Sequence, residues 1–294
     1  MNKALTLTVI FKAGSLNYGE GIGNISELKK IHRSNGDVFS FASRQSIRYD
    51  IVRLGNELFD WNLETVDKAK GTVQFRDNVS IKDSVEMDLF GYLKTDKKSK
   101  KRAAVARLSH AISMEPYNSD MEFLNNMGLA ERIGETPNLA NIEQHESFYT
   151  YTMTVDLNQI GKDEDLELAK EEKAQRVNQL LDILKILNRN IRGRQESLSP
   201  VLVIGGLYPI SNPFFLGCVE LEKGKEWSLK TGLLEDALNI TFGGVSVKSN
   251  TSIGLKRDVF KNDSNIRQLV NKSTDIETFF AGLQKAVTEF YEVD

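Results

Sequence analysis

Cysteine, proline and long apolar runs are scarce in this sequence, and each scarcity excludes a class of protein. Cys218 is the single cysteine among 294 residues, so an internal disulfide framework is excluded and a reducing cytoplasm is expected. No stretch approaches the roughly 20 apolar residues that a membrane-spanning helix needs, and the first residues lack the charged-then-apolar pattern of a signal peptide. The five prolines mark no rigid interdomain linker. We therefore expect a cytoplasmic protein with no membrane partner.

Histidine is also scarce, which argues against a catalytic or metal site. His32, His110 and His145 are scattered and form no i, i+4 pair, and a second cysteine is missing for zinc. His110 falls in an alternating stretch, where a histidine is expected to be a core or strand-pairing residue. Asp37 and Glu20 are isolated carboxylates that could hold a metal for phosphodiester cleavage, which is a weak signal. We therefore expect no catalytic residue, no metal and no cofactor.

Charge is distributed unevenly, although the formal net charge is only −3. Residues 1–110 carry an excess of six positive charges, residues 111–180 an excess of nine negative charges, and residues 181–294 balance. This distribution predicts two oppositely charged surfaces. Solubility is one explanation. A sharper one is a protomer whose acidic face meets the basic face of the next copy.

Hydrophobic periodicity predicts an α+β fold in a single domain of residues 1–294. Strands are expected from alternating polarity or β-branched and aromatic content, at Ala4–Phe11, Glu86–Leu93, Ala103–Met114, Phe148–Leu157 and Pro200–Ile204. Helices are expected from apolar stripes with a period of about 3.6 residues, at about Ser43–Phe59, Glu164–Arg189 and Thr274–Tyr291. This order is that of a ferredoxin-like or RRM-like β-α-β-β-α-β palm. Long insertions are expected at about 60–145, as a finger, and at about 202–220, as a thumb.

The N-terminal unit has the parts of a phosphate-binding device. The strand at Ala4–Phe11 leads into a glycine-rich loop, Asn17–Asn24, and the next helix begins near Ser43. A loop rich in backbone N–H groups and a helix N-terminus both attract anions. The residues that we expect to contact a phosphodiester backbone are Asn17, Gly21, Gly23 and Asn24 in the loop, and Ser43, Arg44, Gln45 and Arg48 in the helix.

Arg44 and Arg48 carry the strongest part of this prediction. On a helical wheel both border the apolar stripe, and both lie where the helix dipole disfavours cations unless an anion is present. The alternative is an ion pair within the chain, with Asp37 or Glu20. For the loop, spacing excludes a dinucleotide-binding fingerprint, because the glycines do not follow the strand directly. A mobile surface loop and a backbone clamp remain as interpretations.

Two further segments are basic. Lys94–Arg102 has six positive charges and one negative charge, and each phosphate that it neutralises would release counterions and add affinity. A solvated hairpin tip is the alternative. The contacts that we expect here are Lys98, Lys100, Lys101, Arg102 and, on a strand face, Arg107. In Asn188–Arg194, the candidates Arg192 and Arg194 follow a helix, whose dipole favours cations even without a ligand.

Leu202–Leu216 is apolar and punctuated by glycine and proline, which is typical of a projecting hairpin or loop. The candidates for insertion are Leu207, Tyr208, Phe214 and Phe215. Apolar wedges can separate stacked bases. Packing onto an adjacent subunit would use the same residues.

Taken together, these motifs resemble the DevR-type backbone subunit of type I-B CRISPR effector complexes (Cascade), in the seventh CRISPR-associated protein family of the RAMP superfamily. The matching segments are Asn24–Ile25 with Leu28–Lys30, Phe41–Tyr49, Asp88–Leu93, Arg102 with Arg107–Pro116, and Ser199–Pro200. The resemblance covers about the first 120 residues well and the rest loosely.

The resemblance implies an RRM-like palm with an inserted thumb, repeated in several copies along a CRISPR guide RNA. Family members hold the RNA backbone and kink bases at intervals, and the bases between them pair with target DNA. It places Ser43, Arg44, Gln45 and Arg48 on the guide-binding helix, and Lys98–Arg102 with Arg107 in a basic strand-loop region. The implied partners are guide RNA, target DNA through the guide, further copies head to tail, and other Cascade subunits.

We therefore expect a non-enzymatic, RNA-binding scaffold, and two alternatives stay open. Related subunits of type III complexes cut RNA with a loop aspartate, so a metal-dependent endoribonuclease on the same fold is the first alternative. A regulatory protein that acts without RNA, which the DevR name allows, is the second.

Overall fold

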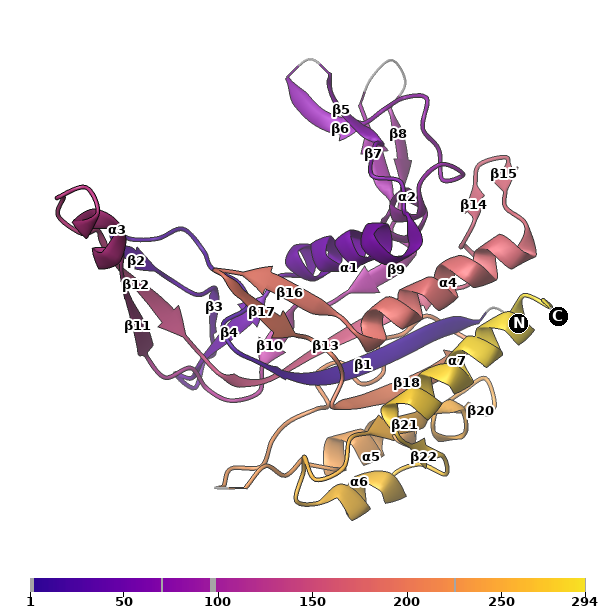
Figure 1. Cartoon of the computed structure of the whole chain (residues 1–294). Coiled ribbons are helices and arrows are strands. Elements are labelled where there is room, and N and C mark those ends of the chain that lie inside the picture. Colours follow the sequence, from indigo (N-terminus) through magenta and orange to yellow (C-terminus); the bar gives the residue numbers. More distant parts are fainter. Residues whose placement is uncertain (1–2, 70, 96–98, 225, 294) are drawn as a thin grey trace.

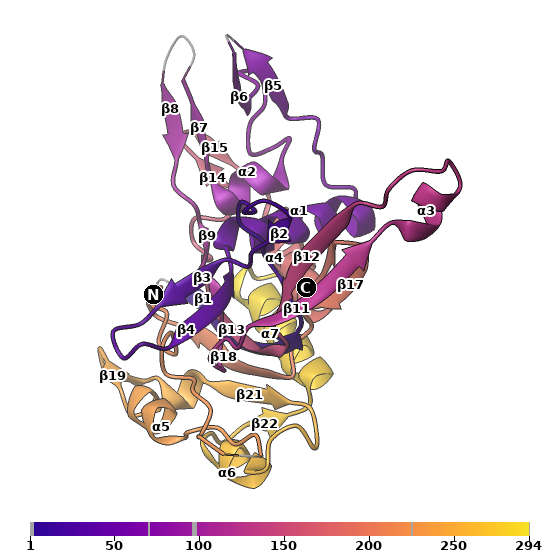
Figure 2. The ribbon, with the colours of Figure 1, turned by 90° about the vertical axis from the view of Figure 1, so that its left-hand side faces the viewer.

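The structure of the protein is a computed structural model that describes residues 3–69, 71–95, 99–224 and 226–293. Figures 1 and 2 show a central sheet, helices packed on it and two arms that project away from it. In spatial order the sheet is formed by β22 (Ser273–Thr274), β21 (Ser252–Leu255), β18 (Leu202–Tyr208), β1 (Ala4–Ala13), β13 (Ser147–Asp156), β10 (Ala111–Ser113), β4 (Val38–Ala42) and β3 (Lys30–His32), and β9 (Ala106–Leu108) also pairs with β13. The fold is of the mixed α+β class, as the sequence predicts.

β1 and β13 form the centre of the sheet. They pair antiparallel over ten residues, from Ala4 opposite Asp156 to Ala13 opposite Ser147. β1 also pairs antiparallel with β18, so both of its edges are occupied. All of β1 is buried except Lys12. The strands expected at Ala4–Phe11 and Phe148–Leu157 are therefore confirmed, and they are the most enclosed part of the sheet.

Three long helices share one hydrophobic core with the sheet: α1 (Arg44–Phe59), α4 (Lys170–Lys185) and α7 (Ile276–Phe290). Every second residue of β1, from Leu5 to Phe11, packs into this core. The opposite face of the sheet has a second core, in which Ile10 and Phe148 pack with residues of α5 (Gly232–Leu238) and α6 (Asp263–Gln268). None of the helices in the described residues is long and apolar enough to cross a membrane.

Two arms extend from this body (Figures 1 and 2). The first, called the finger below, consists of β11 (Asp120–Asn125), α3 (Met127–Glu131) and β12 (Leu139–Gln144), and β12 pairs with β2 (Ile25–Ser26). The second, called the projection, consists of β5 (Val66–Ala69), β6 (Thr72–Phe75), α2 (Val85–Phe90), β7 (Tyr92–Lys94) and β8 (Lys100–Arg102). In Figure 1 the finger extends to the left and the projection upward, with α1 near the angle between them.

The remaining elements are short. They are the hairpins β14 (Lys162–Asp163) with β15 (Leu166–Glu167), β16 (Asn188–Ile191) with β17 (Arg194–Ser197), and β19 (Thr241–Phe242) with β20 (Val245–Ser246), and the 3-10 helix Lys248–Asn250.

The strand expected at Glu86–Leu93 is wrong, because most of this segment is helix α2. Ser84 caps the helix: its Oγ accepts a hydrogen bond from the Met87 N–H at 3.2 Å. All positions from Met87 to Phe90 are buried, so this part of the helix has no exposed face whose spacing would indicate a helical period. A capped helical turn and a strand look alike in so short a segment.

Two other predicted elements have wrong bounds. The helix expected at Glu164–Arg189 begins at Lys170, because the β14–β15 hairpin precedes it, and ends at Lys185. The segment Asn188–Arg194 is therefore the β16–β17 hairpin and not a helix end. The strand expected at Ala103–Met114 is broken into β9 and β10.

A buried ionic cluster connects the projection to the body. Asp88 of α2 is fully buried. Its carboxylate accepts hydrogen bonds from Arg102 Nη2 at 2.7 Å, Arg176 Nη1 at 2.9 Å and the Gly161 N–H at 2.9 Å. Arg102 belongs to β8 and Arg176 to α4. One carboxylate thus joins two elements of the projection to the body, and compensates two nearly buried guanidinium groups.

We expect Asp88→Ala to lower the free energy of unfolding by about 3–5 kcal/mol, because both guanidinium groups would lose their buried counter-charge. Chemical denaturation measures this change. The control is Glu57→Ala, whose half-exposed carboxylate pairs with Arg53 at 2.9 Å on α1, and which should cost less than about 1 kcal/mol. Equal, small losses in both variants would contradict the role given to the cluster.

Candidate nucleic-acid interface

The first turn of α1 is held by two side chains from distant parts of the chain. Ser43 caps the helix, with its Oγ accepting from the Ser46 N–H at 3.2 Å. The Ser43 N–H donates to Asn17 Oδ1 at 3.0 Å, and the Arg44 N–H donates to His110 Nδ1 at 3.1 Å. The side chain of Asn17 therefore fixes the start of α1 through a hydrogen bond within the protein. The side chains of Arg44 and Gln45 are exposed.

A positively charged environment surrounds this turn. Partial burial and the charges of Arg44 and Lys29 lower the pKa of His110, which places both cations close to the imidazole. Among the described residues, neither Arg44 nor Lys29 forms an ion pair within the distances of a salt bridge. Uncompensated cations at a helix N-terminus form an anion-binding site. The alternative considered from the sequence, an ion pair of Arg44 with Asp37 or Glu20, does not describe this site.

Arg48 is in a different situation from Arg44. Its Nη2 lies 2.6 Å from Glu86 Oε1, and its guanidinium lies over the Phe90 ring at 5.1 Å. Its side chain is about one-third exposed. Arg48 therefore has a carboxylate partner within the chain, although in α2 and not at the two positions that we considered from the sequence. Its contribution to an anion site is smaller than that of Arg44.

The glycine-rich loop is a closed turn. The N–H groups of Gly19, Ile22 and Ile25 all bond to carbonyls within Asn17–Leu28, so they are not free to clamp an anion. A side chain at Gly21 would put its Cβ 2.6 Å from the Ile25 carbonyl oxygen, and Gly23 has a φ of +60°. These two glycines are therefore required by the turn itself. Gly21, Gly23 and Asn24 are exposed and lie at its tip.

The β16–β17 hairpin adds two cations beside this loop. Arg192, at its tip, is exposed, donates from Nη2 to Ser26 Oγ at 3.0 Å, and lies over the Tyr18 ring at 5.1 Å. Arg194 donates from Nη1 to Gln144 Oε1 at 2.8 Å. Burial raises the pKa of Tyr18, and the two arginines partly offset this rise. Tyr18 and the arginines are far apart in sequence, so only the fold brings them together.

The basic tract of the projection divides into separate roles. Lys98 lies outside the described residues. Lys101 and Arg107 are exposed, with Arg107 Nε donating to the Ala104 carbonyl. Arg102 is nearly buried in the Asp88 cluster and also donates to backbone carbonyls. The prediction that Arg102 contacts RNA is therefore wrong, because its guanidinium is nearly buried and donates its hydrogen bonds to Asp88 and to backbone carbonyls.

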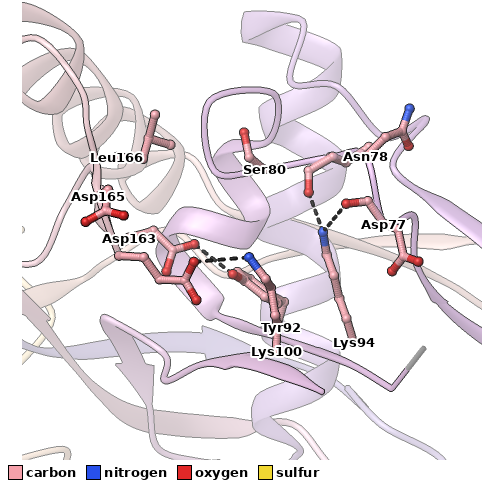
Figure 3. Close-up of a pocket in the computed structure, with 11 residues that line it drawn as sticks. Asp77, Asn78, Ser80, Tyr92, Lys94, Lys100, Asp163, Asp165 and Leu166 are labelled. Atoms are coloured by element: carbon pink, nitrogen blue, oxygen red, sulfur yellow. Dashed lines mark hydrogen bonds and ion pairs between the residues drawn. The ribbon is translucent and has the colours of Figure 1, made fainter. Parts of the chain in front are cut away.

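Figure 3 shows that the same tract faces carboxylates across a hollow of about 520 Å³. Lys100 pairs with Glu164 at 3.1 Å, and the Tyr92 hydroxyl donates to Asp163 at 2.8 Å. Burial, helped by Asp163, raises the pKa of Tyr92 to about 12. Lys94 is buried and donates to the carbonyls of Asp77 and Val79. These groups satisfy one another, so this hollow is not a cationic groove.

The segment expected to project as a thumb is instead part of the body. Leu202–Tyr208 is strand β18, between β1 and β21. Tyr208, Phe214 and Phe215 are buried in the second core, and Leu207 packs against the first. The prediction of an inserting wedge at Leu207, Tyr208, Phe214 and Phe215 is wrong. The strand expected at Pro200–Ile204 overlaps β18, but its end was misplaced, because a strand that is buried on both faces lacks the alternation that would show where it stops.

In the described part of the chain, the potential metal-binding side chains do not form a cluster. Within the residues that the structure describes, no group of three or more His, Cys, Asp or Glu side chains could hold a metal ion. Asp37 lies in the turn before β4, where its carboxylate accepts from the Asn35 amide at 2.8 Å. Burial raises the pKa of Cys218, and its thiol is half-buried. The prediction that His110 is a core or strand-pairing residue is wrong, because it is exposed and lies between strands β9 and β10.

Comparison with solved structures shows that the fold of this chain has known counterparts. One similar chain, from a "CRISPR RNA-guided surveillance complex, pre-nicking", has a TM-score of 0.62 at 11% identity, and the match covers 95% of this chain and 100% of the other. Another, from a "CRISPR RNA-guided surveillance complex", has a TM-score of 0.52 at 14% identity, and covers 95% and 99%. At these identities the likeness shows a shared fold. No curated protein matches the chain.

The family follows from the sequence match. Residues 5–221 match the family described as "CRISPR-associated negative auto-regulator DevR/Csa2". Because the match spans well over half of the chain, the protein belongs to this CRISPR-associated family. The resemblance expected from the motifs is confirmed.

We expect Phe215→Ala to lower the free energy of unfolding by about 3–5 kcal/mol, because the ring is fully buried. Leu216→Ala is the matched control, since its neighbouring side chain is 52% exposed and should cost less than about 0.5 kcal/mol. Chemical denaturation compares the two. A stable Phe215→Ala protein that has lost RNA binding would restore the wedge interpretation.

Proposed function

We propose that this protein is a guide-RNA-binding scaffold subunit of a type I-B, Cascade-like CRISPR surveillance complex. The observation that carries the proposal is the exposed start of α1, where Arg44 and Lys29 lie near His110 without a carboxylate partner among the described residues, and where Gln45 is also exposed. Membership of the DevR/Csa2 family and structural neighbours from RNA-guided complexes support RNA as the anion. Other subunits of the complex are the further partners.

We also propose that the body is an RRM-like palm. Its support is the order of four strands, β18–β1–β13–β10, in which every neighbouring pair is antiparallel. Along the chain, α1 follows β1, and α4 follows β13. This is the β-α-β-β-α-β arrangement of ferredoxin-like folds. On this view the finger and the projection are insertions.

The arrangement at α1 suits recognition of the phosphate backbone. Each phosphate carries a negative charge, which Arg44, Lys29 and the positive end of the helix dipole all attract. Backbone contacts fix position without reading sequence. The base edges are then available to pair with target DNA, so sequence recognition belongs to the guide.

Two alternatives follow from other observations. A metal-dependent endoribonuclease on this fold would depend on Asp37 in the turn before β4, which belongs to no group of three or more potential metal ligands among the described residues. We propose that the protein does not cleave RNA. The description of the family as a negative auto-regulator favours the second alternative, a regulatory protein that acts without RNA.

We further propose that copies of the chain associate head to tail through the finger. Its large apolar side chains are exposed although the arm is ordered by β-pairing, and they are Met121, Phe123, Leu124, Met127, Leu129, Ile133 and Leu139. Patches of this kind mark protein interfaces. Four carboxylates against one arginine in residues 120–139 disfavour contact with RNA and favour a basic protein surface. Such a contact joins different surfaces of two copies, and a repeated heterologous contact builds a filament.

We expect Arg44→Ala to weaken binding of single-stranded RNA regardless of sequence, and to reduce the slope of log K against log salt by about 1, because one phosphate contact is lost. Arg48→Ala should have a smaller effect, since Glu86 already pairs with Arg48. Fluorescence anisotropy at several salt concentrations measures both.

Arg53→Ala is the control on the same helix, because its guanidinium bonds to Glu57 and Asn188 within the chain. An unchanged affinity and slope in Arg44→Ala would reject the α1 site. Protein that is purified free of RNA from cells that express a CRISPR array would favour the regulatory alternative.

We expect Phe123→Asp combined with Ile133→Asp to reduce the number of copies bound along one long RNA. The two side chains are 58% and 75% exposed, so burying charges at a neighbour should oppose assembly while the melting temperature stays within about 2 °C. Mass photometry counts the copies. Leu233→Asp, an exposed position on α5, is the control. Unchanged assembly in the double variant would exclude the finger from the contact.

A further inference from the structure

His110 lies in the break between β9 and β10, at the start of α1. Its Nδ1 accepts the Arg44 N–H at 3.1 Å. An imidazole nitrogen that accepts has no proton, so in the neutral ring the proton must be on Nε2. The backbone of α1 thereby selects one tautomer of His110.

The surroundings of the ring keep it in this neutral form. Partial burial, Arg44 and Lys29 all lower its pKa, so it carries no charge near neutral pH. Protonation would place an Nδ1–H against the Arg44 N–H and break the bond between them. The ring also packs against Phe41, with the ring centroids 5.1 Å apart, which limits its rotation.

One polar group of this ring has no partner. Within the part of the chain that the structure describes, Nε2 makes no hydrogen bond, although the residue is exposed and its Nδ1 is engaged. An acceptor such as an asparagine oxygen would suffice to satisfy the Arg44 N–H. The imidazole adds something that a simple cap does not need, namely an N–H donor of fixed direction beside two cations.

We propose that His110 is a phosphate-contacting residue of the RNA interface, in which Nε2–H donates to a phosphate oxygen while Nδ1 holds the first turn of α1. This proposal rests on the RNA-binding function proposed above. It assigns to one side chain both the position of the Arg44 backbone and a direct contact with the ligand. A phosphate oxygen would receive a neutral donor from His110 and charged donors from Arg44 and Lys29.

The experiment compares two substitutions that separate the two nitrogen atoms. His110→Asn keeps an acceptor near the position of Nδ1 and lacks the donor. His110→Gln can place an amide N–H near the position of Nε2. We expect His110→Asn to retain the wild-type melting temperature and to bind single-stranded RNA about tenfold more weakly, because a hydrogen bond to a charged acceptor is lost. His110→Gln should recover part of this loss.

Nitrogen-15 NMR of labelled histidine supplies a readout that a purely structural role would not change. In the free protein we expect the Nε2–H tautomer, and on addition of RNA the Nε2 resonance should shift and its proton should exchange more slowly with water.

Wild-type affinity in His110→Asn, or an Nε2 resonance that RNA does not shift, would overturn the proposal for His110 alone. Loss of stability in parallel with loss of binding in both variants would also reject the contact and leave only the cap. Arg44→Ala decides the RNA-binding function separately, because its backbone N–H is retained. An unaffected Arg44→Ala protein would remove the basis for both proposals.

Discussion

The buried carboxylate of Asp88 is the interaction on which the arrangement of the cationic face depends. It holds α2 against α4 and β8 through two arginines. Because α2 is fixed, Glu86, two residues before Asp88, is held where it pairs with Arg48 of α1. A buried ionic cluster of this kind is a weak source of net stability, but it requires all of its partners at once. The cluster therefore specifies where the projection stands relative to α1, and which arginine of α1 remains available.

The sequence predicts best those elements whose pattern is local. α1 has an apolar stripe, and Ser43 lies at its start, so its first residue was expected almost correctly. β1 and β13 are long and bounded by polar residues, and both were found. The strand expected at Pro200–Ile204 was found in part as β18, but the rest of that strand was assigned to a projecting thumb, because both faces of β18 are buried and its pattern gives no face to solvent. The α2 segment failed because a helix of six residues is too short to show its period.

The candidate site is less predictable than the fold, because the charge of a side chain in the sequence does not indicate which residue it pairs with in the structure. Lys101 and Arg102 are neighbours in one basic tract, yet one is exposed and the other is enclosed with Asp88, 14 residues earlier. Arg192 reaches Ser26, 166 residues away. His110 looked like a core residue because the sequence alternates around it, and the break between β9 and β10 turns its ring outward. Arg44 and Gln45 were expected at the start of α1 and lie there with exposed side chains, because the helix itself could be predicted from its local pattern.

The distribution of charge within the fold bears on how a protein of net charge −3 can hold an anionic polymer. The acidic excess is concentrated in the finger and in the β14–β15 hairpin opposite the projection. Cations without a carboxylate partner among the described residues lie instead at the start of α1, where Arg44 is, and at the tip of the β16–β17 hairpin, where Arg192 is. At physiological ionic strength a charge is screened beyond about 8 Å, so a phosphate beside Arg44 responds to its local cations and hardly to the distant carboxylates. For the RNA-binding function proposed above, separation in space, and not the total charge, would therefore decide the affinity, and the acidic finger would keep an RNA strand away from the surface proposed for a neighbouring copy.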